Sequence, residues 1–204
     1  MAGTSRAATA IGTAALFFAV VAAAGIVGLD GFVARYTATL QDGGTVWAQG
    51  IDLLNRAAFR EVAAFALGAV LMLAGGLLMI LRSSRAVGFP LFYVGLVHFL
   101  TTGAATLAAP LLGRVRPIEA AGGDLWFTGG DSFPSPDAAF FAGLFFPLIV
   151  LFPRWSPLLV LPPLFIAAAR LMEHDHYLSD VSASLALAAL LAAALAALAE
   201  KGRG

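Results

Sequence analysis

The chain has 204 residues, of which 60% are hydrophobic and only 12% are charged, and its mean hydropathy is +0.90. A soluble domain carries about 25% charged residues, so this composition excludes a water-soluble globule and predicts a membrane protein. The absence of Cys excludes a disulfide framework and thiolate metal sites. Twelve Lys and Arg balance twelve Asp and Glu, so the net charge does not indicate a nucleic-acid partner. The length fits one domain over residues 1–204.

Charge-poor apolar stretches recur along the whole chain. Each approaches the length of about 20 residues that crosses a bilayer as a helix, which predicts an all-α, six-transmembrane-helix bundle. The six predicted spans are 7–29, 62–81, 86–113, 138–153, 155–169 and 181–199. The fourth and fifth are short and interrupted by prolines, so we expect kinked or tilted helices there. The first is longer than the apolar region of a signal peptide, and we expect it to remain as an anchor.

The charges sort to the two sides of the predicted bundle. Six crossings place both termini on one side, together with the following residues: Arg6, Arg82, Arg85, Arg154, Lys201, Arg203 and the single acid Glu200. The other eleven of the twelve acids lie on the opposite side with six arginines. Cytoplasmic loops are rich in Lys and Arg, so we expect both termini in the cytoplasm. The long polar loops would then lie outside the cytoplasmic (inner) membrane.

The segment between the first two spans has a helical apolar stripe. Trp47, Ile51, Leu54 and Ala58 recur at intervals of four, three and four residues. Two interpretations stay open: an amphipathic helix in the membrane interface, or a connecting helix packed on the bundle.

Three polar clusters stand at the outer ends of the spans. They are Gly113–Pro117 after the third span, Ser132–Asp137 before the fourth, and Arg170–Asp180 between the fifth and sixth. Clusters that share one membrane depth can converge on one pocket, because neighbouring spans pack side by side.

The residue types in these clusters suit a phosphate ester. Arg116 and Arg170 offer forked N–H donors that match phosphate oxygens, and Ser135 at a helix start adds a neutral donor. His176 and Asp180 are four residues apart. If they share a helix face, the carboxylate can accept the imidazole N–H, and the other ring nitrogen becomes a nucleophile or base.

The spacing of the third cluster is more specific. Arg170, five residues, His176, three residues and Asp180 resemble the third signature of the type 2 phosphatidic acid phosphatase family. The Arg-Pro after the third span and the Phe-Pro-Ser before the fourth resemble its first and second signatures. The resemblance implies a six-span membrane phosphatase that hydrolyses lipid phosphates or diphosphates without a metal or other cofactor, through a phosphohistidine.

When the signatures are matched position by position, the resemblance implies that His176 is the nucleophile and that Asp180 is its orienting carboxylate. It makes Arg116, Arg170 and Ser135 the phosphate binders.

Three positions depart from the signatures. Ala109 stands where the first signature has a Lys, and Arg114 is a candidate to replace that cation. Asp137 stands where the second has the His that protonates the leaving group, and it is a candidate general acid because a buried carboxyl can hold a proton. Ala169 stands where the third often has Ser.

Two functions therefore stay open: a lipid phosphate phosphatase, or a catalytically degenerate relative that binds a lipid phosphate or acts as a partner subunit. The expected partners are the lipid substrate and the bilayer, without nucleic acid. The sequence does not choose among phosphatidate, phosphatidylglycerol phosphate, isoprenyl phosphates and lipid A phosphates, and it does not specify an oligomeric state.

The remaining polar residues receive structural interpretations. His98, in mid-span, is expected to form hydrogen bonds between helices. His174 and Asp175, beside Glu173, are expected to be solvated rather than metal ligands, and no metal site is predicted. Trp126 is expected to anchor at the interface.

Overall fold

The computed structural model of the chain describes residues 2–40, 44–57, 64–81, 85–120 and 124–201. Within these ranges the secondary structure is helical and contains no strand, which confirms the all-α class. The longer helices are α1 (Ala2–Ala24), α2 (Asp30–Ala38), α3 (Gly44–Ala57), α5 (Ala66–Ile80), α6 (Arg85–Leu112), α7 (Pro136–Leu151), α9 (Leu161–Met172) and α10 (Leu178–Lys201). The shorter elements are the π-helical η1 (Gly25–Leu29), the 3₁₀ turns η3 (Pro117–Glu119) and η4 (Pro153–Trp155), and α8 (Ser156–Leu159).

Several of these helices match the predicted spans. In the described ranges, four helical segments are long and apolar enough to cross a membrane: Ser5–Ala38, Arg85–Glu119, Pro153–Met172 and Leu178–Lys201. The apolar helices α5 and α7 have 15 and 16 residues, which is about 23 Å of helix and less than the hydrocarbon thickness of about 30 Å. The chain is thus an integral membrane protein, and the count of six crossings stays a prediction.

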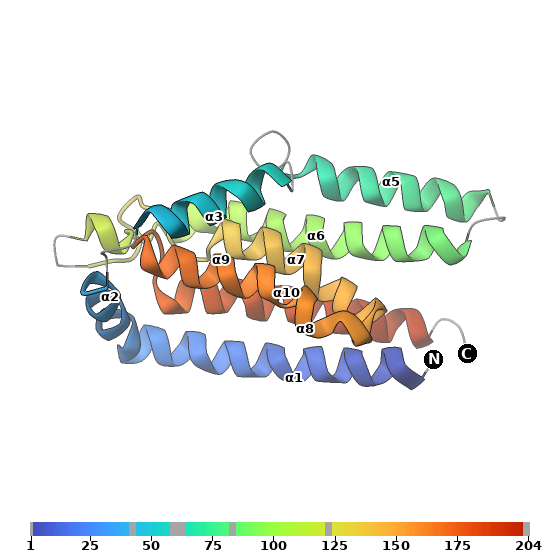
Figure 1. Ribbon diagram of the computed structural model, residues 1–204, viewed down its shortest axis with the longest axis horizontal. Helices are drawn as coiled ribbons and strands as arrows, with labels where there is room; N and C mark the ends of the chain where they lie inside the picture. The colour runs from blue at the N-terminus through green and yellow to red at the C-terminus, as the bar shows by residue number, and fades with distance from the viewer. Residues whose placement is uncertain (1, 41–43, 58–63, 82–84, 121–123, 202–204) are drawn as a thin grey trace.

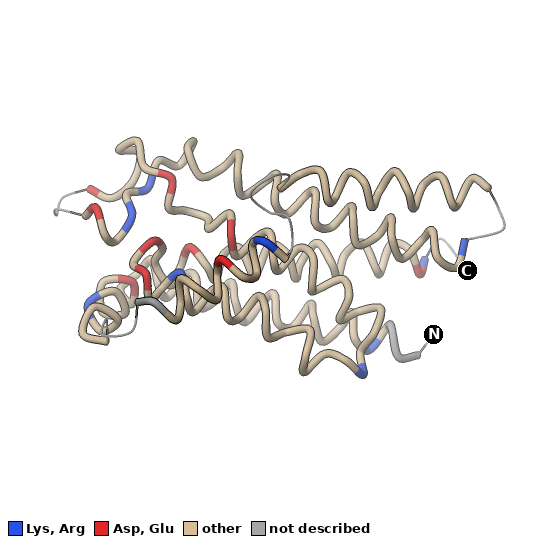
Figure 2. The backbone as a smooth tube through the Cα atoms, turned by 45° about the horizontal axis from the view of Figure 1, so that its top comes forward, with Lys and Arg blue, Asp and Glu red and all other residues tan. Residues whose placement is uncertain are grey.

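The long helices run along one direction, and both termini lie at the same end of the bundle (Figure 1). At the opposite end, α2 is set at an angle to α1 (Figure 1). Most acidic residues gather toward this second end (Figure 2). The separation of charge predicted from the sequence is therefore present along the long axis.

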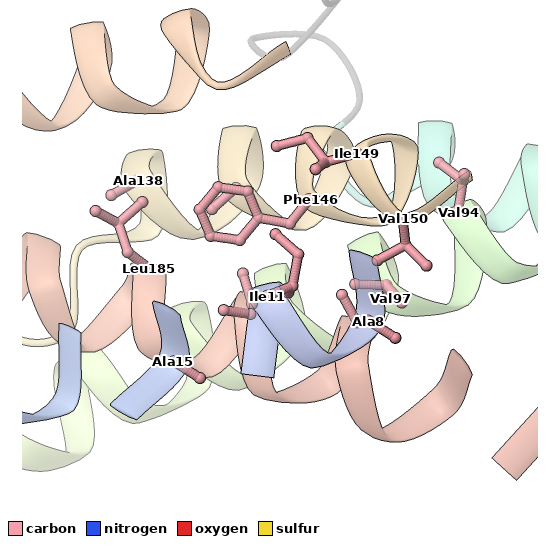
Figure 3. Close-up of a cluster of buried hydrophobic side chains, with 14 of the residues drawn as sticks. Ala8, Ile11, Ala15, Val94, Val97, Ala138, Phe146, Ile149, Val150 and Leu185 are labelled. Carbon is pink, nitrogen blue, oxygen red and sulfur yellow. The ribbon is translucent and has the colours of Figure 1, made fainter. Parts of the chain in front are cut away.

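Helix α10 lies at the centre of the bundle and packs against α1, α6, α7 and α9. Its small and apolar residues face a core that includes Ile11 of α1, Val97 of α6 and Phe146 of α7 (Figure 3). Ala188 and Ala192 of α10 are fully buried, so their small size allows neighbouring helices to approach closely.

Helices α5 and α6 approach closely at four glycines, Gly68, Gly75, Gly88 and Gly95. A Cβ atom on Gly95 would lie 2.7 Å from both the carbonyl oxygen of Gly68 and the backbone nitrogen of Met72. The same interface holds His98, which is fully buried. Its ring nitrogens lie 3.2 Å from the Phe140 carbonyl oxygen and 3.3 Å from that of Ala64, so it bridges helices as expected.

Helix α3 packs on α9, as in the second interpretation of the apolar stripe. Ile51 is 5% exposed, and the Trp47 ring lies 5.5 Å from the Phe165 ring. Leu54 packs against the same cluster, whereas Ala58 lies outside the described residues.

Candidate functional site

The three polar clusters meet at the end of the bundle opposite the termini. The backbone N–H of Ser132 donates to the carbonyl of Arg114 at 2.9 Å, which joins the first cluster to the second. The N–H of Ser135 donates to the carbonyl of Asp180 at 3.2 Å, which joins the second to the third. Helix α7 begins at Pro136 with Ser135 as its N-cap, because proline fits the first helical turn and serine the cap.

His176 is buried, and one ring nitrogen has a defined partner. Its Nδ1 lies 2.8 Å from the carbonyl oxygen of Ser132. A carbonyl only accepts, so Nδ1 carries the proton and donates it. The lone pair is then on Nε2, the nitrogen available for attack on an electrophile.

Asp180 is also fully buried, but it does not accept the imidazole proton directly. Its Oδ2 lies 3.7 Å from Nδ1 of His176, beyond hydrogen-bond distance. Oδ2 instead accepts from the Ser132 hydroxyl at 2.6 Å and the Tyr177 N–H at 2.7 Å. The predicted shared helix face is absent because α10 begins at Leu178, two residues after His176. Asp180 is therefore connected to His176 through the Ser132 hydroxyl, whose oxygen lies 3.5 Å from Nδ1 of His176.

Arg114 occupies a different place from the one predicted. Its guanidinium is 2% exposed and donates to Asp180, Ser179 and Asp30. Its Cζ lies 4.0 Å from the Tyr177 ring centre. Arg114 follows the end of α6 and turns into the protein behind Asp180, where these acceptors take up its NH1 and NH2 groups. This placement argues against Arg114 as the replacement for the Lys that is missing at Ala109.

Arg116 and Arg170 both contact carboxylates. Arg116 donates to Asp131 at 2.8 Å and to Asp175 at 3.3 Å. Arg170 donates to Glu173 at 3.0 Å and to Asp175 at 2.7 Å, and it lies 2.7 Å from Asp137. Asp175 thus bridges the two arginines, and the expectation that Asp175 and Glu173 are merely solvated was wrong.

Arg116, Arg170 and the four carboxylates that they contact are called the cradle below. With two arginines and four carboxylates, the cradle has a net negative charge. Burial raises the pKa of Glu173; the charge of Arg170 opposes this rise, and the charges of Asp175 and Asp137 add to it. The hydrogen bond from Arg116 lowers the pKa of Asp131. A phosphate that binds here must displace these carboxylates from Arg116 and Arg170.

Ser135 and Asp137 lie in the first turn of α7. The Ser135 hydroxyl accepts from the Ala138 N–H at 3.3 Å, and its carbonyl accepts from Ser184 at 2.8 Å. A capping hydroxyl still has its own proton to donate to an anion. Asp137 is 8% exposed and contacts Arg170, so it is within reach of whatever that arginine binds.

His174 contacts a neighbouring helix. Its Nε2 lies 3.3 Å from the Thr37 hydroxyl on α2, and its φ of 60° is in the left-handed region. Across the described ranges, no group of three or more His, Asp or Glu side chains is arranged to hold a metal ion.

A shallow, mostly apolar depression lies beside His176, and it is too narrow to hold a water molecule. Its walls come from α2, η3, α9 and the loop before α10, and its lining residues include Val33, Ala34, Pro117, Leu171 and Leu178.

Sequence reasoning did not assign roles to Ser132, Ser179 or Asp30. Ser132 belongs to the second cluster, but its partners depend on how the chain turns before α7. Asp30 is the first acid after the N-terminal span, and this position at a span end was the available signal.

Comparison with known proteins places these features in a family. Residues 87–203, more than half of the chain, match the model of the PAP2 superfamily. No curated protein matches the chain. Among solved structures, the chain is similar to a transmembrane PAP2-type phosphatidylglycerolphosphate phosphatase from Bacillus subtilis, with 19% identity and a TM-score of 0.52. That similarity covers 94% of this chain and 96% of the other and shows a shared fold. The matched residues contain all three polar clusters, and the family suggested by their spacing is confirmed: the chain belongs to the PAP2 superfamily.

Proposed function

We propose that the protein is a membrane phosphatase that hydrolyses a lipid phosphate or diphosphate through a phosphohistidine at His176. The observation that carries this proposal is the hydrogen bond from Nδ1 of His176 to the Ser132 carbonyl, which leaves Nε2 as the nucleophile. A binding protein needs the arginines but has no use for a histidine held in one tautomer.

In this mechanism the phosphate displaces the carboxylates from Arg116 and Arg170, whose N–H groups neutralise its oxygens. Nε2 of His176 attacks phosphorus while the bond to the leaving oxygen breaks. Asp137, in its protonated form, donates a proton to that oxygen. Asp137, now ionised, takes a proton from a water molecule that attacks the phosphorus of the phosphohistidine. The bond between phosphorus and Nε2 breaks, phosphate leaves, and His176 and protonated Asp137 are both restored.

The charge distribution supports an orientation for the reaction. The cations near the termini favour a cytoplasmic location for that end, which puts the site at the outer face of the cytoplasmic membrane. The substrate would approach sideways from the bilayer, along the apolar side chains of α2 and α9 that lie beside His176.

One observation favours the second function, a degenerate relative that binds a lipid phosphate or acts as a partner subunit. Both cradle arginines already have carboxylate partners, and Ala109 replaces a cation of the family signature. This function predicts saturable lipid-phosphate binding without turnover.

The deciding experiment is phosphate release by the purified protein in detergent. The panel contains phosphatidate, phosphatidylglycerol phosphate, an isoprenyl diphosphate and a lipid A phosphate, and EDTA is present throughout. Release that is inhibited by vanadate and lost in His176→Ala supports the proposal. Binding of a lipid phosphate without release supports the second function. Activity that disappears in EDTA and returns with a divalent ion contradicts the metal-free mechanism.

A further inference from the structure

A buried polar cluster contacts Oδ1 of Asp180, whereas Ser132 and Tyr177 contact Oδ2. Arg114 donates through NH1 to Asp180 and Ser179, and through NH2 to Asp30 at 2.6 Å. Asp30 also accepts from the Ser179 N–H at 2.9 Å and from its hydroxyl. The side chains of Asp30, Arg114 and Asp180 are at most 8% exposed, so solvent screens their charges little.

The N-terminal helix is shaped to bring Asp30 to this place. Asp30 begins α2 directly after the π-helical turn η1. Gly25, in that turn, leaves room for the contact, because a Cβ there would lie 2.6 Å from Oδ1 of Asp30 and 2.9 Å from the Cβ of Ser179. Asp30 also lies outside the segment that matches the PAP2 superfamily, so the family signatures give it no role.

The charges in the cluster explain what Asp30 can do. Arg114 alone would neutralise Asp180, and the pair would present no net charge to His176. With Asp30, the three side chains carry a net charge of about −1 when ionised. The histidine becomes cationic when Nε2 bonds to phosphorus while Nδ1 keeps its proton. A net negative charge nearby stabilises that cation.

We propose that Asp30 is a positioning residue of the reaction: it balances Arg114, so that Asp180 keeps a net negative charge toward His176. The same contacts hold Ser179 at the start of α10, next to Asp180. This inference rests on the proposed function, because it concerns the histidine that the mechanism makes the nucleophile.

Other charged and titratable groups lie near His176, and all of them except His174, which the labelling experiment replaces in every protein compared, stay unchanged in the test. They are Asp131 and Arg116 in the loops before α7, Asp175, His174 and Tyr177 before α10, and Arg170, Asp137 and Glu173 in the cradle. Because the proteins compared in each experiment share the same set of these groups, a difference in the titration of His176 reports on Asp30 and Arg114.

The test compares Asp30→Asn, Arg114→Gln and the double variant by the pH profile of kcat/KM. Protonation of Nε2 produces the acid limb of that profile. Asp30→Asn removes a negative charge, so the midpoint moves to lower pH by about 0.5 to 1 unit, and kcat falls. Arg114→Gln removes a positive charge and moves it to higher pH. The double variant keeps the net charge and restores the midpoint.

A second measurement follows the protonation of His176 and does not require turnover. Diethyl pyrocarbonate acylates only neutral imidazole, so the rate of labelling at His176 against pH gives the same midpoint. The background variant His174→Asn leaves one histidine in the loop, and Asn tolerates the left-handed backbone there. Peptide mass spectrometry separates His176 from His98.

Two controls separate charge from packing. Asp52→Asn makes the same charge change on the exposed face of α3 and should leave the midpoint in place. Ser179→Ala removes the hydroxyl from the buried cluster without changing a charge, so it should lower thermal stability and leave the midpoint unchanged. If one of the two charge variants fails to fold, the midpoint of the other still tests the inference. It must move to lower pH in Asp30→Asn or to higher pH in Arg114→Gln.

Opposite shifts in the two charge variants support the inference, and midpoints that coincide with the parent protein overturn it. The two proposals fail in different ways. Shifted labelling midpoints without hydrolysis of any lipid phosphate would contradict the proposed function alone. Hydrolysis with unshifted midpoints would contradict the role of Asp30 alone.

Discussion

Asp137 stands where the family signature has a histidine, and its carboxylate lies 2.7 Å from Arg170. A group that protonates a leaving oxygen must hold a proton at that moment, whereas a neighbouring guanidinium favours the ionised carboxylate. A bound phosphate offsets this effect, because it takes up the charge of Arg170. The chemistry at this position therefore depends on the substrate being present.

Asp137→Asn should lower kcat for a monophosphate by about 100-fold or more, since Asn has no proton to give to an alkoxide. The loss should be smaller for a diphosphate, whose departing phosphate is a weaker base. Rates for both substrates from pH 4 to 9 provide the test. Equal rates for Asn and Asp on a monophosphate would show that Asp137 is not the acid.

Glu173 makes substrate binding dependent on pH. Burial raises its pKa, so it takes up a proton at a higher pH than an ordinary Glu. Protonation removes one carboxylate charge from Arg170, and KM should fall as the pH is lowered. Glu173→Gln should lower KM at pH 7.5 by about two- to fivefold and weaken this dependence. If KM keeps its full pH dependence in Glu173→Gln, that dependence comes from another group.

The raised pKa of Glu173 also makes the stability of the folded protein depend on pH. An acid with a higher pKa in the folded than in the unfolded protein favours folding when it is protonated. The stabilisation is therefore gained as the pH falls through the raised pKa, and it is absent at higher pH. Thermal unfolding of Glu173→Gln should depend less on pH in this range than that of the parent protein.

The interface between α5 and α6 depends on glycine at close contacts. Gly95→Ala places a Cβ 2.7 Å from backbone atoms of α5 and should lower the free energy of unfolding by about 1 to 3 kcal/mol. Gly103→Ala is the matched control in the same helix, because a Cβ there meets its nearest atom at 3.9 Å. Thermal unfolding in detergent compares the two. Equal stability of both variants would mean that the helices are not packed as described.

The sequence predicted the elements that depend on local pattern. The apolar stripe of α3 follows from residue spacing, and the placement of Ser135 at a helix start is close to the observed start of α7 at Pro136, two residues before the predicted span. The glycine contacts of α5 and α6 did not follow, because they require knowing which helices are neighbours. The convergence of the three polar clusters could be predicted, since each stands at the end of an apolar span.

The contacts within the site were less predictable. Arg114 is two residues from Arg116, but the chain leaves its helix after Leu112, and the two side chains then reach different partners. The carboxylates around Arg170 come from one short loop and from α7, and their pairing depends on the turn at His174. Asp30 comes from more than 80 residues before Arg114, so only the packing of the N-terminal helix brings it to the site.

For the molecule as a whole, the separated charges predict an orientation. The chain contains no Cys, so single cysteines can report on each side. Asp124→Cys, in an exposed loop near the site, should react with a membrane-impermeant maleimide in intact cells. Glu200→Cys, near the C-terminus, should react only after permeabilisation. Labelling of Glu200→Cys in intact cells would reverse the orientation.

The central claim is that His176 forms a covalent bond to phosphorus. The most direct measurement is rapid acid-free quenching of the protein with a ³²P-labelled lipid phosphate, followed by identification of the labelled peptide. We expect a label that is stable in alkali, labile in acid and located on His176, and that is lost in His176→Ala while lipid-phosphate binding remains. Turnover of the same substrate by His176→Ala, or a label on another residue, would contradict the account.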